Sequence, residues 1–342
     1  MKVLIIGGTG LISTAITRYL IERGEDVTLY NRGVSQTDVP PGLRHIQGDR
    51  TQYATVEAQM AEAGHFDCVI DMVCFKPGEA ESAIRAFQGR IGQYVFCSTV
   101  DVYTKPARRY PVTEDAERKP SLTFPYAFDK AACERLLEEA HQRGDFPVTV
   151  IRPAHTYGEG RGLIHAFGWE TYYFDRIRKG KPIIVQGDGT SFWATCHRDD
   201  VGRAFAAAVG NERTFGRAYH VAGEEPMTWD GYHQTVAEAM GAPKPRLVHI
   251  PTDLLGTVAP KAAEWCVENF HFNNIFDNAA ASADLGFRQT IPWLEGVRRV
   301  VDWLDEHGKI DSSDEPAFYD RILDAWERFG VKMVQELADL DI

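Results

Sequence analysis

The sequence predicts an α/β fold, with a doubly wound parallel sheet and a smaller second lobe. Three observations predict this class. Short aliphatic or β-branched runs alternate with segments of helical pattern through the first half of the chain, which is typical of parallel strands joined by helices on both sheet faces. A glycine-rich turn follows the first aliphatic run, and turn-forming segments interrupt the alternation beyond Pro153.

Each strand of the predicted sheet is a short apolar run. The runs expected as strands are residues 3–6, 26–30, 45–46, 68–70, 94–97 and 148–151. The intervening segments with helical composition are residues 11–23, 55–63, 79–87 and 126–143. The result is a layer of at least six strands with helices on both faces.

The second half of the chain is predicted to build the smaller lobe and to return once to the sheet. The elements expected there are a helix at 199–209, a sheet strand at 218–221, and helices at 229–240 and 293–307. The sheet domain is accordingly expected from residues 1–154 and 195–225. The smaller lobe with the C-terminal helices is expected from residues 155–194 and 226–342.

Two apolar features of this second half leave alternatives open. The aromatic side chains of residues 167–173 are typical either of a wall on which a sugar stacks or of a core. Residues 315–340 read as a long amphipathic helix or a helix pair. Ile322, Trp326 and Phe329 form a stripe on it that fits either docking on the protein's own body or a contact in a homodimer.

Composition excludes several classes of function. Among the 342 residues, 37 Lys and Arg oppose 49 Asp and Glu, giving a net charge of −12 that disfavours general nucleic-acid binding. The six cysteines form no CxxC pair or zinc-finger cluster, so we expect a reduced, cytoplasmic protein without a structural metal. No apolar run approaches the ~20 residues that span a bilayer, and the N-terminal run is too short for a signal peptide.

The clearest chemical signal is the segment Gly7-Gly8-Thr9-Gly10-Leu11-Ile12-Ser13, between the first strand and the first helix. Small residues there allow a tight turn and let a pyrophosphate approach the helix N-terminus, where free N–H groups favour negative charge. The segment therefore predicts a dinucleotide site.

The end of the second strand bears on which dinucleotide binds. An acid there bonds the ribose of NAD, but this chain has Asn31 and Arg32. A guanidinium pairs well with a 2′-phosphate, so NADP is favoured over NAD; a solvated surface Arg is the alternative. Asp49, after the third strand, is placed to touch the adenine or to form a turn.

Tyr126 and Lys130 lie four residues apart on a predicted helix, and so share one face. A neighbouring ammonium is expected to lower the pKa of the tyrosine, making it a base for a hydroxyl proton. Ser98 and Thr99 end the fifth strand, at the carboxyl edge where ligands bind to such sheets.

The glycine turn, Ser98-Thr99 and the YxxxK helix, in this order, resemble the extended, epimerase/dehydratase-like branch of the short-chain dehydrogenase/reductase superfamily. Further matching segments are Ser98 to Tyr103, Tyr126 to Glu134, Arg152-Pro153 with Tyr157-Gly158, Gly187 to Gly189, His197 to Val201 and Asp284 to Phe287. The likeness covers about residues 1–307. The pattern, including Asn31-Arg32-Gly33, is similar to an atypical bacterial subgroup related to chloroplast stem-loop-binding proteins.

The resemblance implies a Rossmann-type fold and specific roles. Thr99 would orient the substrate hydroxyl, Tyr126 would act as acid and base, and Lys130 would lower the Tyr126 pKa and hold the nicotinamide ribose. The reaction would be hydride transfer between a substrate carbinol and NADP or NAD. The residues expected at the cofactor are Gly7, Thr9, Gly10, Leu11, Ile12, Asn31, Arg32, Asp49, Arg50, Val73, Cys97, Tyr126, Lys130 and Pro153.

Departures from the family pattern bear on the substrate, expected to be a small sugar-like molecule. Trp193 stands where nucleotide-sugar members have an Arg for the phosphates, which disfavours a nucleotide diphosphate sugar, and His155 replaces an Asn. Val100 and Asp101 replace the two acids of sugar dehydratases, which disfavours dehydration. Lys76, Asp101, His155 and Trp193 are the substrate candidates. Alternative functions are a non-catalytic or RNA-associated binding protein and a simple NADPH-dependent carbonyl reductase.

Overall fold

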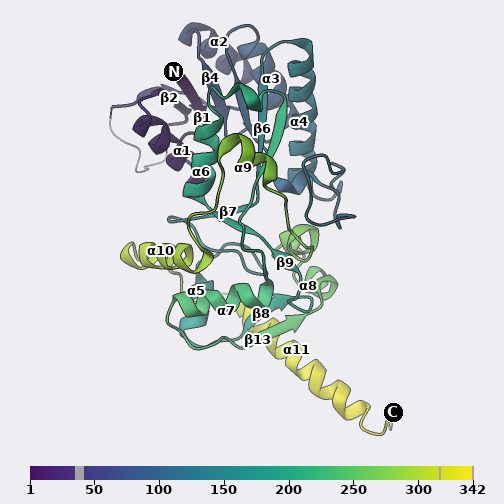
Figure 1. The fold of residues 1–342 in the computed structure, drawn as a ribbon. Helices are drawn as coiled ribbons and strands as arrows, with labels where there is room; N and C mark the ends of the chain where they lie inside the picture. Colours follow the sequence, from purple (N-terminus) through teal and green to yellow (C-terminus); the bar gives the residue numbers. More distant parts are fainter. Residues whose placement is uncertain (35–41, 316, 341–342) are drawn as a thin grey trace. The chain divides into compact units, whose positions relative to one another are not determined.

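The computed structural model describes residues 1–34, 42–315 and 317–340, and the chain divides into two compact units (Figure 1). The first unit consists of Met1–Gly158, Ala194–Pro226 and Ile275–Pro292. The second unit consists of Glu159–Trp193, Met227–Asn274 and Trp293–Ile342.

The first unit is built on a seven-stranded parallel sheet of strand order β11-β6-β5-β4-β1-β2-β3. Its strands are β1 (Lys2–Ile6), β2 (Asp26–Asn31), β3 (Arg44–Gln47), β4 (Cys68–Asp71), β5 (Tyr94–Cys97), β6 (Val148–Pro153) and β11 (Arg217–Val221). The doubly wound α/β class is thereby confirmed. The order reverses between β1 and β4, and ligands bind outside the carboxyl ends of the strands at such a switch point.

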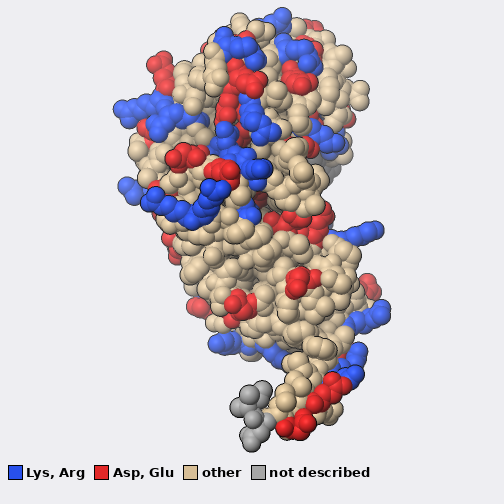
Figure 2. All heavy atoms as spheres, turned by 90° about the vertical axis from the view of Figure 1, so that its right-hand side faces the viewer, with Lys and Arg blue, Asp and Glu red and all other residues tan. Residues whose placement is uncertain are grey.

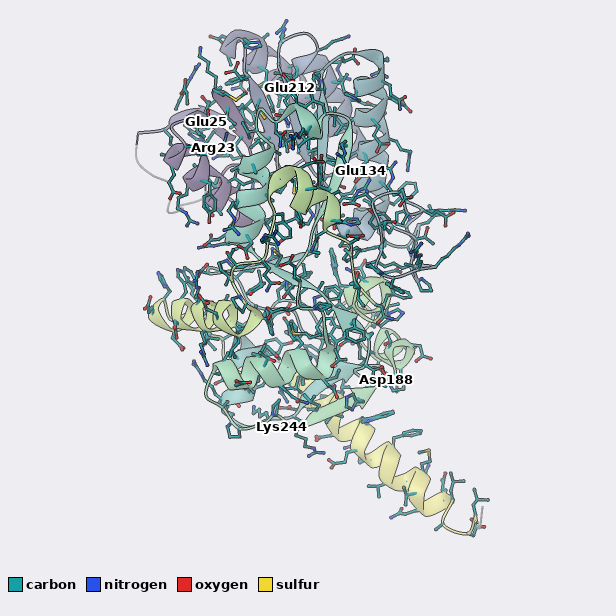
Figure 3. The ribbon with its side chains drawn as sticks, viewed as in Figure 1. Arg23, Glu25, Glu134, Asp188, Glu212 and Lys244 are labelled. Atoms are coloured by element: carbon teal, nitrogen blue, oxygen red, sulfur yellow. The ribbon has the colours of Figure 1, made fainter. Side chains whose placement is uncertain are left out.

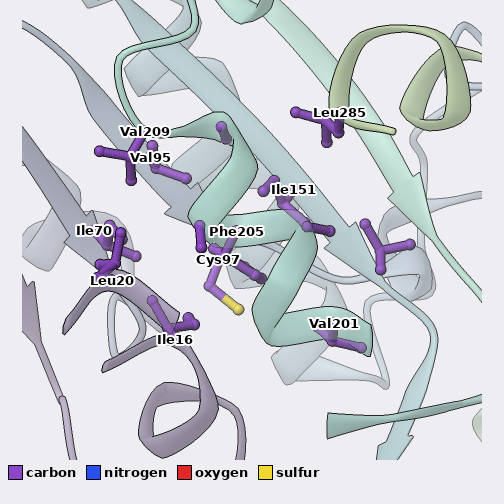
Figure 4. Packing of buried hydrophobic residues seen from close by; sticks show 14 of the residues in the cluster. Ile16, Leu20, Ile70, Val95, Cys97, Ile151, Val201, Phe205, Val209 and Leu285 are labelled. Carbon is purple, nitrogen blue, oxygen red and sulfur yellow. The ribbon is translucent and has the colours of Figure 1, made fainter. Parts of the chain in front are cut away.

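Helices cover both faces of this sheet because successive strand residues point to opposite faces. One face is covered by α1 (Leu11–Glu22), α6 (Arg198–Ala208) and α9 (Ala279–Leu285), and the other by α2 (Tyr53–Ala63), α3 (Pro77–Phe87) and α4 (Pro125–Arg143). In β1, Val3 and Ile5 enter the first core, whereas Leu4 and Ile6 enter the second. Figure 4 shows the first core, with Ile16 and Leu20 of α1 facing Val201 and Phe205 of α6.

Residues 275–292 belong to the first unit, which corrects the predicted boundaries. The Asn278 amide exchanges two hydrogen bonds with the Ala222 backbone, at 3.1 and 2.8 Å. The buried Asp200 carboxylate accepts the N–H groups of Thr290 and Ile291 at 2.8 and 3.1 Å. These contacts lie about 60 to 90 residues apart in the chain, so no local sequence pattern reveals them.

The first unit also contains short elements near the sheet edge. A parallel pair joins β7 (His155–Tyr157) to β10 (Thr195–His197). Two 3₁₀ turns, η1 (Val100–Val102) and η2 (Glu212–Thr214), follow β5 and α6.

The second unit packs helices around two small strand pairs. Its strands are β8 (Ile183–Gln186) paired with β13 (Leu247–Ile250), and β9 (Phe192–Trp193) paired with β12 (Met227–Thr228). Its helical segments are α5 (Tyr172–Arg178), α7 (Trp229–Ala239), α8 (Thr252–Val258), η3 (Cys266–Phe270), α10 (Trp293–Glu306) and α11 (Ala317–Glu336). The C-terminal segment, left open as one helix or two, is the single helix α11.

Aromatic side chains form much of the second unit's core. Phe167, Tyr172 and Tyr173 are each at most 6% exposed, which favours the core interpretation over a sugar-stacking wall. Among the described residues, none of the helices has the length and apolar composition needed to cross a bilayer.

Candidate active site at the carboxyl edge of the sheet

The glycine-rich turn lies directly between β1 and α1, as predicted. Gly7 has φ +84°, and a Cβ built on it would lie 2.4 Å from Cγ1 of Val73. A Cβ on Gly8 would lie 2.6 Å from Cδ2 of Leu29. Both positions therefore exclude larger residues, for reasons of packing and, at Gly7, of backbone conformation.

Ser13, where the third glycine of the common fingerprint stands, closes this turn. Its hydroxyl donates to the Gly7 carbonyl at 2.7 Å and accepts the Gly10 N–H at 2.7 Å. Thr9 donates its N–H to the same carbonyl at 2.9 Å. The turn is held in one shape from inside, and it leads into α1, whose first-turn N–H groups and dipole favour an anion.

The end of β2 presents polar side chains at the same edge. Asn31 Oδ1 accepts the Gly33 N–H at 2.8 Å and contacts His45 Nε2 at 2.6 Å, while Arg32 is exposed. The pKa of Asp49 is lowered mainly by hydrogen bonds from Thr51, with a smaller contribution from the charge of Arg32. Arg32 and Asp49 are thus neighbours at this edge.

Arg50 differs from the expectation that it contacts a cofactor. It is 7% exposed, and its Nη2 donates to Asp71 at 3.1 Å and to the Glu79 carbonyl at 2.6 Å. Tyr94 also donates to Asp71, at 2.7 Å. These contacts favour an internal role for Arg50, because a buried charge is stable only when paired.

Thr99 lies two residues beyond the end of β5, caps the N-terminus of η1 and is 6% exposed. Its hydroxyl donates to the Asp101 carboxylate at 3.1 Å, and Lys105 Nζ contacts the other oxygen of that carboxylate at 2.9 Å. The side chains of Asp101 and Lys105 are 10% and 12% exposed. Sequence reasoning did not find Lys105, although its spacing of four residues from Asp101 is a weak signal for this pair.

Tyr126 is hydrogen-bonded to Thr99, so the structure brings together the two residues expected to handle the substrate hydroxyl. The pKa of Tyr126 is nevertheless raised well above its ordinary value, not lowered as expected. Burial is the largest cause, followed by the Asp101 carboxylate, and the Thr99 hydrogen bond opposes them.

Lys130 lies one helical turn beyond Tyr126 and is 1% exposed. Its Nζ donates to the Cys97 carbonyl at 2.6 Å and lies 4.6 and 4.9 Å from the ring centres of Phe75 and Phe96. The ammonium is thus directed at the end of β5. For this reason its charge does not determine the pKa of the Tyr126 phenol.

Glu134, two turns beyond Tyr126 on α4, anchors this arrangement (Figure 3). Its fully buried carboxylate accepts Ser98 Oγ at 2.5 Å and two nitrogens of Arg152 at 2.8 Å, and it also pairs with Arg118. Burial raises the pKa of Glu134, but the two guanidiniums and Ser98 outweigh it, so that the pKa is lowered. The network fixes α4 against β5 and β6, and with it the distance between Thr99 and Tyr126.

The remaining cofactor candidates lie at strand ends of the same edge. Pro153 ends β6, Val73 faces Gly7, and the carbonyl of Cys97 holds Lys130. Burial raises the pKa of the Cys97 thiol to about 11, so this cysteine is not a thiolate nucleophile at neutral pH.

The substrate candidates come from several elements. Lys76 is exposed at the start of α3, and His155 lies in β7 beside Tyr157, both in the first unit. Trp193 belongs to the second unit, is 3% exposed, and stacks on Trp229 with 5.0 Å between ring centres. That burial favours a core role for Trp193.

Comparison with curated proteins finds relatives of differing function. The chain is 30% identical over 261 residues to the chloroplast stem-loop binding protein of 41 kDa b of Arabidopsis thaliana, covering 72% of this chain and 65% of the relative. It therefore spans slightly less than two thirds of that relative's length. It is 27% identical over 314 residues to 2′-dehydrokanamycin reductase of Streptomyces kanamyceticus, covering 92% and 87%.

Solved structures share the fold. The UDP-glucuronic acid 4-epimerase of Bacillus cereus, in complex with UDP-glucuronic acid and NAD, superposes with a TM-score of 0.72 at 17% identity, over 90% of this chain and 100% of that one. A dTDP-glucose 4,6-dehydratase of Bacillus anthracis in complex with NAD gives 0.72 at 15% identity, over 90% and 97%.

Residues 3–222 match the family described as the NAD dependent epimerase/dehydratase family. This span holds the glycine turn, Thr99, Tyr126, Lys130 and all of the seven-stranded sheet except Lys2. By that match over more than half its length, and by the fold that carries it, the chain belongs to the NAD dependent epimerase/dehydratase family.

Proposed function

We propose that this protein is an NAD(P)-dependent oxidoreductase or epimerase that acts on a sugar or sugar-like hydroxyl by tyrosine-assisted hydride transfer. The observation that carries the proposal is the hydrogen bond between Thr99 and Tyr126 beside the buried Lys130. These groups lie at the carboxyl edge that also bears the glycine turn, where a reacting carbon and a cofactor can meet.

The turn fits the pyrophosphate of a dinucleotide. Gly7 and Gly8 have no room for a Cβ, and Ser13 holds the loop against the N-terminus of α1. Gly7 to Ile12 would hold the pyrophosphate, Asn31 and Arg32 the adenosine end, and Lys130 the nicotinamide ribose. When bound, the nicotinamide supplies the acceptor or donor of hydride.

The chain's own residues would handle the proton. Thr99 orients the substrate oxygen, and Tyr126 gives a proton to it or takes one from it. Like an ordinary tyrosine, Tyr126 is protonated at neutral pH and can donate a proton, and its raised pKa disfavours the phenolate further. The Lys130 ammonium lies over the rings of Phe75 and Phe96, whose faces stabilise cationic charge.

This protonation state favours a second candidate, a simple NADPH-dependent carbonyl reductase. Carbonyl reduction consumes the proton that Tyr126 holds, whereas alcohol oxidation needs the phenolate. The relative named 2′-dehydrokanamycin reductase, which matches over 92% of this chain, supports the same direction. A reductase exchanges its cofactor in every cycle, whereas an epimerase returns the hydride and can retain its nucleotide.

An RNA-associated role is suggested by the stem-loop binding relative alone. The net charge of −12 opposes it, and on the face shown in Figure 2 basic and acidic side chains are interspersed. Phosphate contacts weaken steeply as salt rises. Binding of a structured RNA in a gel-shift assay that falls with salt would favour this role over catalysis.

The decisive experiment combines cofactor binding with turnover. NAD, NADH, NADP and NADPH are each titrated at up to millimolar concentration in a thermal-shift assay, and nucleotide released on denaturation is identified. The proposal requires at least one of them to bind. UDP-glucuronic acid, dTDP-glucose and a keto-aminoglycoside then serve as substrate probes.

Tyr126→Phe is the matched test of mechanism. It removes the hydroxyl and retains the ring, so cofactor-induced stabilisation should persist while turnover falls by roughly a hundredfold or more. Turnover at the wild-type rate would exclude Tyr126 as the acid or base. Tyr53→Phe, on α2 and outside the site, is the control.

A further inference from the structure

The first half of α11 is fixed to the second unit. Tyr319 is 1% exposed and accepts the Ile184 N–H at 2.8 Å. The Arg176 guanidinium lies 3.9 Å from the Tyr319 ring centre and pairs with Asp320 at 2.8 Å. This half is therefore an integral part of the unit.

The second half of the helix has no such cover. Among the described residues from 327 to 340, every one is exposed except Gly330, which is half-buried. The apolar side chains of Phe329, Met333, Leu337 and Leu340 are 47% to 55% exposed. Contiguous exposed apolar surface of this kind marks an interaction site.

These side chains continue a single stripe that begins in the anchored half. The apolar residues recur at positions 322, 326, 329, 333, 337 and 340. This is an 11-residue repeat of about 3.67 residues per turn, close to that of a straight α-helix. The stripe therefore runs along one face of α11 to its last residue, Glu336, and Leu337 and Leu340 continue the spacing in the turn that follows.

A groove of about 980 Å³ flanks the anchored half. One wall is α11, with Ile322 and Phe329, and the other is α8 and the residues that follow it. Leu254 and Val258 on the α8 wall are 36% and 52% exposed. Apolar side chains thus line both walls.

The charges beside the stripe are complementary between its two ends. At 100° per residue, Arg321, Arg328 and Glu336 lie on one flank of the stripe, and Asp339 follows the end of the helix. The groove carries Lys261, Arg321 and Arg328 against Asp324, a net charge of +2, whereas residues 332–340 carry one Lys against two acids, a net charge of −1. Acidic side chains are visible at the lower end of the view in Figure 2.

We propose that the groove is filled by the end of α11 from a second copy of this chain. In an antiparallel pair, Met333, Leu337 and Leu340 of each copy lie against the groove of the other, and Arg321 meets the partner's acidic end. The arrangement is reciprocal, as a two-fold dimer requires. The pairing extends beyond the proposed function and does not depend on it.

Other occupants fit less well. Because α11 forms one wall of the groove and continues as an unbroken helix, its own far end points away from that groove. Helices that lie on membranes have polar faces rich in Lys and Arg, whereas residues 332–340 carry a net negative charge. A second copy both covers the apolar stripe and brings opposite charges together.

Sedimentation and light scattering of the full chain over a range of micromolar concentrations test the association. The wild type should show about twice the 38.4 kDa chain mass. Met333→Glu with Leu337→Glu should raise the dimer dissociation constant by at least roughly a hundredfold, and Val258→Glu should act similarly. Gln335→Glu, which adds the same charge on the opposite face of α11, should leave the dimer intact.

Disulfide formation tests the geometry. The native cysteines are all buried, so the thiols introduced by Leu254→Cys and Leu337→Cys are the accessible ones. Mixing the two single variants under mild oxidation should produce a covalent heterodimer. Three results would overturn the proposal: a monomeric wild type, binding of the monomer to phosphatidylserine vesicles, or, in a variant that carries both cysteines, disulfides only within single chains.

Discussion

A single carboxylate adds to the effect of burial on the pKa of the proposed acid. Asp101 is the largest contribution after burial to the raised pKa of Tyr126, and it also accepts the Thr99 hydroxyl. Lys105 contacts the same carboxylate at 2.9 Å. The Asp101–Lys105 pair therefore both orients Thr99 and disfavours the phenolate.

Asp101→Asn should lower the pKa of Tyr126. The substitution removes a negative charge that opposes the phenolate and leaves the Lys105 ammonium nearby, so both effects have the same sign. Substrate oxidation needs the phenolate, so the ascending limb of its pH profile should then move to lower pH. The measurement is kcat/KM against pH.

The control for this prediction is Glu139→Gln, which removes a carboxylate from the exposed face of α4. Its pH profile should match the wild type. An unchanged profile in Asp101→Asn, or a shift to higher pH, would contradict the role of the carboxylate.

Arg32→Ala should weaken NADP binding selectively. Arg32 is exposed beside Asn31 and Asp49 at the sheet edge, where a 2′-phosphate would lie. Loss of a charge-assisted contact costs about 1.5–3 kcal/mol, or roughly tenfold to hundredfold in affinity. Calorimetric titration should show this loss for NADPH and nearly none for NADH, and equal losses would assign Arg32 no part in selectivity.

Residue-level predictions from the sequence succeeded where a motif fixed local backbone. The turn from Gly7 to Ser13 has the predicted place because its residue types determine its shape. The charge environment of Tyr126 was predicted with the wrong sign, since the pKa depends on burial and on Asp101, which the YxxxK spacing does not report. Lys105 was missed for the same reason.

Helix α4 carries three residues of the site region on successive turns: Tyr126, Lys130 and Glu134. Glu134 connects it to Ser98, directly after β5, and to Arg152 on β6. Because the carboxylate is fully buried, its neutralisation would leave two guanidiniums incompletely paired. The register of α4 against the sheet therefore depends on this one charge.

Glu134→Gln should destabilise the protein by on the order of 3 kcal/mol at neutral pH. The pKa of Glu134 is lowered in the folded state, so its stabilisation is present above the ordinary glutamate pKa and is lost as pH falls through the lower folded value. The difference in free energy of unfolding between variant and wild type should therefore shrink in acid.

Urea denaturation at neutral and acidic pH measures this difference. Glu57→Gln is the matched control, since Glu57 pairs with Arg85 at 2.8 Å on the surface and should cost less than about 1 kcal/mol. A Glu134→Gln variant no less stable than this control would show that the network is not needed for stability.

Predictions at the level of elements depended on how local the determining contacts are. Strands and helices of the first 154 residues were found because each shows its own periodicity. The return of residues 275–292 to the first unit was missed because Asn278 and Asp200 hold it through hydrogen bonds that span distant parts of the chain. The stacking of Trp193 on Trp229, which favours a core role over the predicted substrate role, is likewise not visible in the sequence.

At the scale of the whole molecule, both units contain buried neutral histidines. In the first unit, His220 Nε2 contacts the Tyr103 hydroxyl at 2.5 Å and Nδ1 contacts the Asp277 carbonyl at 2.9 Å. Burial lowers the pKa of His220 to about 4. In the second unit, burial lowers the pKa of His233 to about 3.

These pKa values predict that the folded protein loses stability in mild acid. A histidine whose pKa is lowered by folding stabilises the protein above its unfolded pKa of about 6.5, and this contribution is lost as pH falls toward the folded value. For His220 the loss is on the order of 3 kcal/mol by about pH 4.

His220→Gln should make this dependence shallower. A glutamine can donate to the Asp277 carbonyl and accept from Tyr103, but it does not titrate, so the variant loses one of the groups whose protonation opposes folding. Melting temperatures from about pH 7 to pH 4.5 should fall less steeply than in the wild type. His65→Gln, at a side chain 63% exposed, should follow the wild-type curve. If the melting temperature of His220→Gln also follows the wild-type curve, the pKa of His220 is the same in the folded and unfolded chain. The acid sensitivity would then arise from other groups.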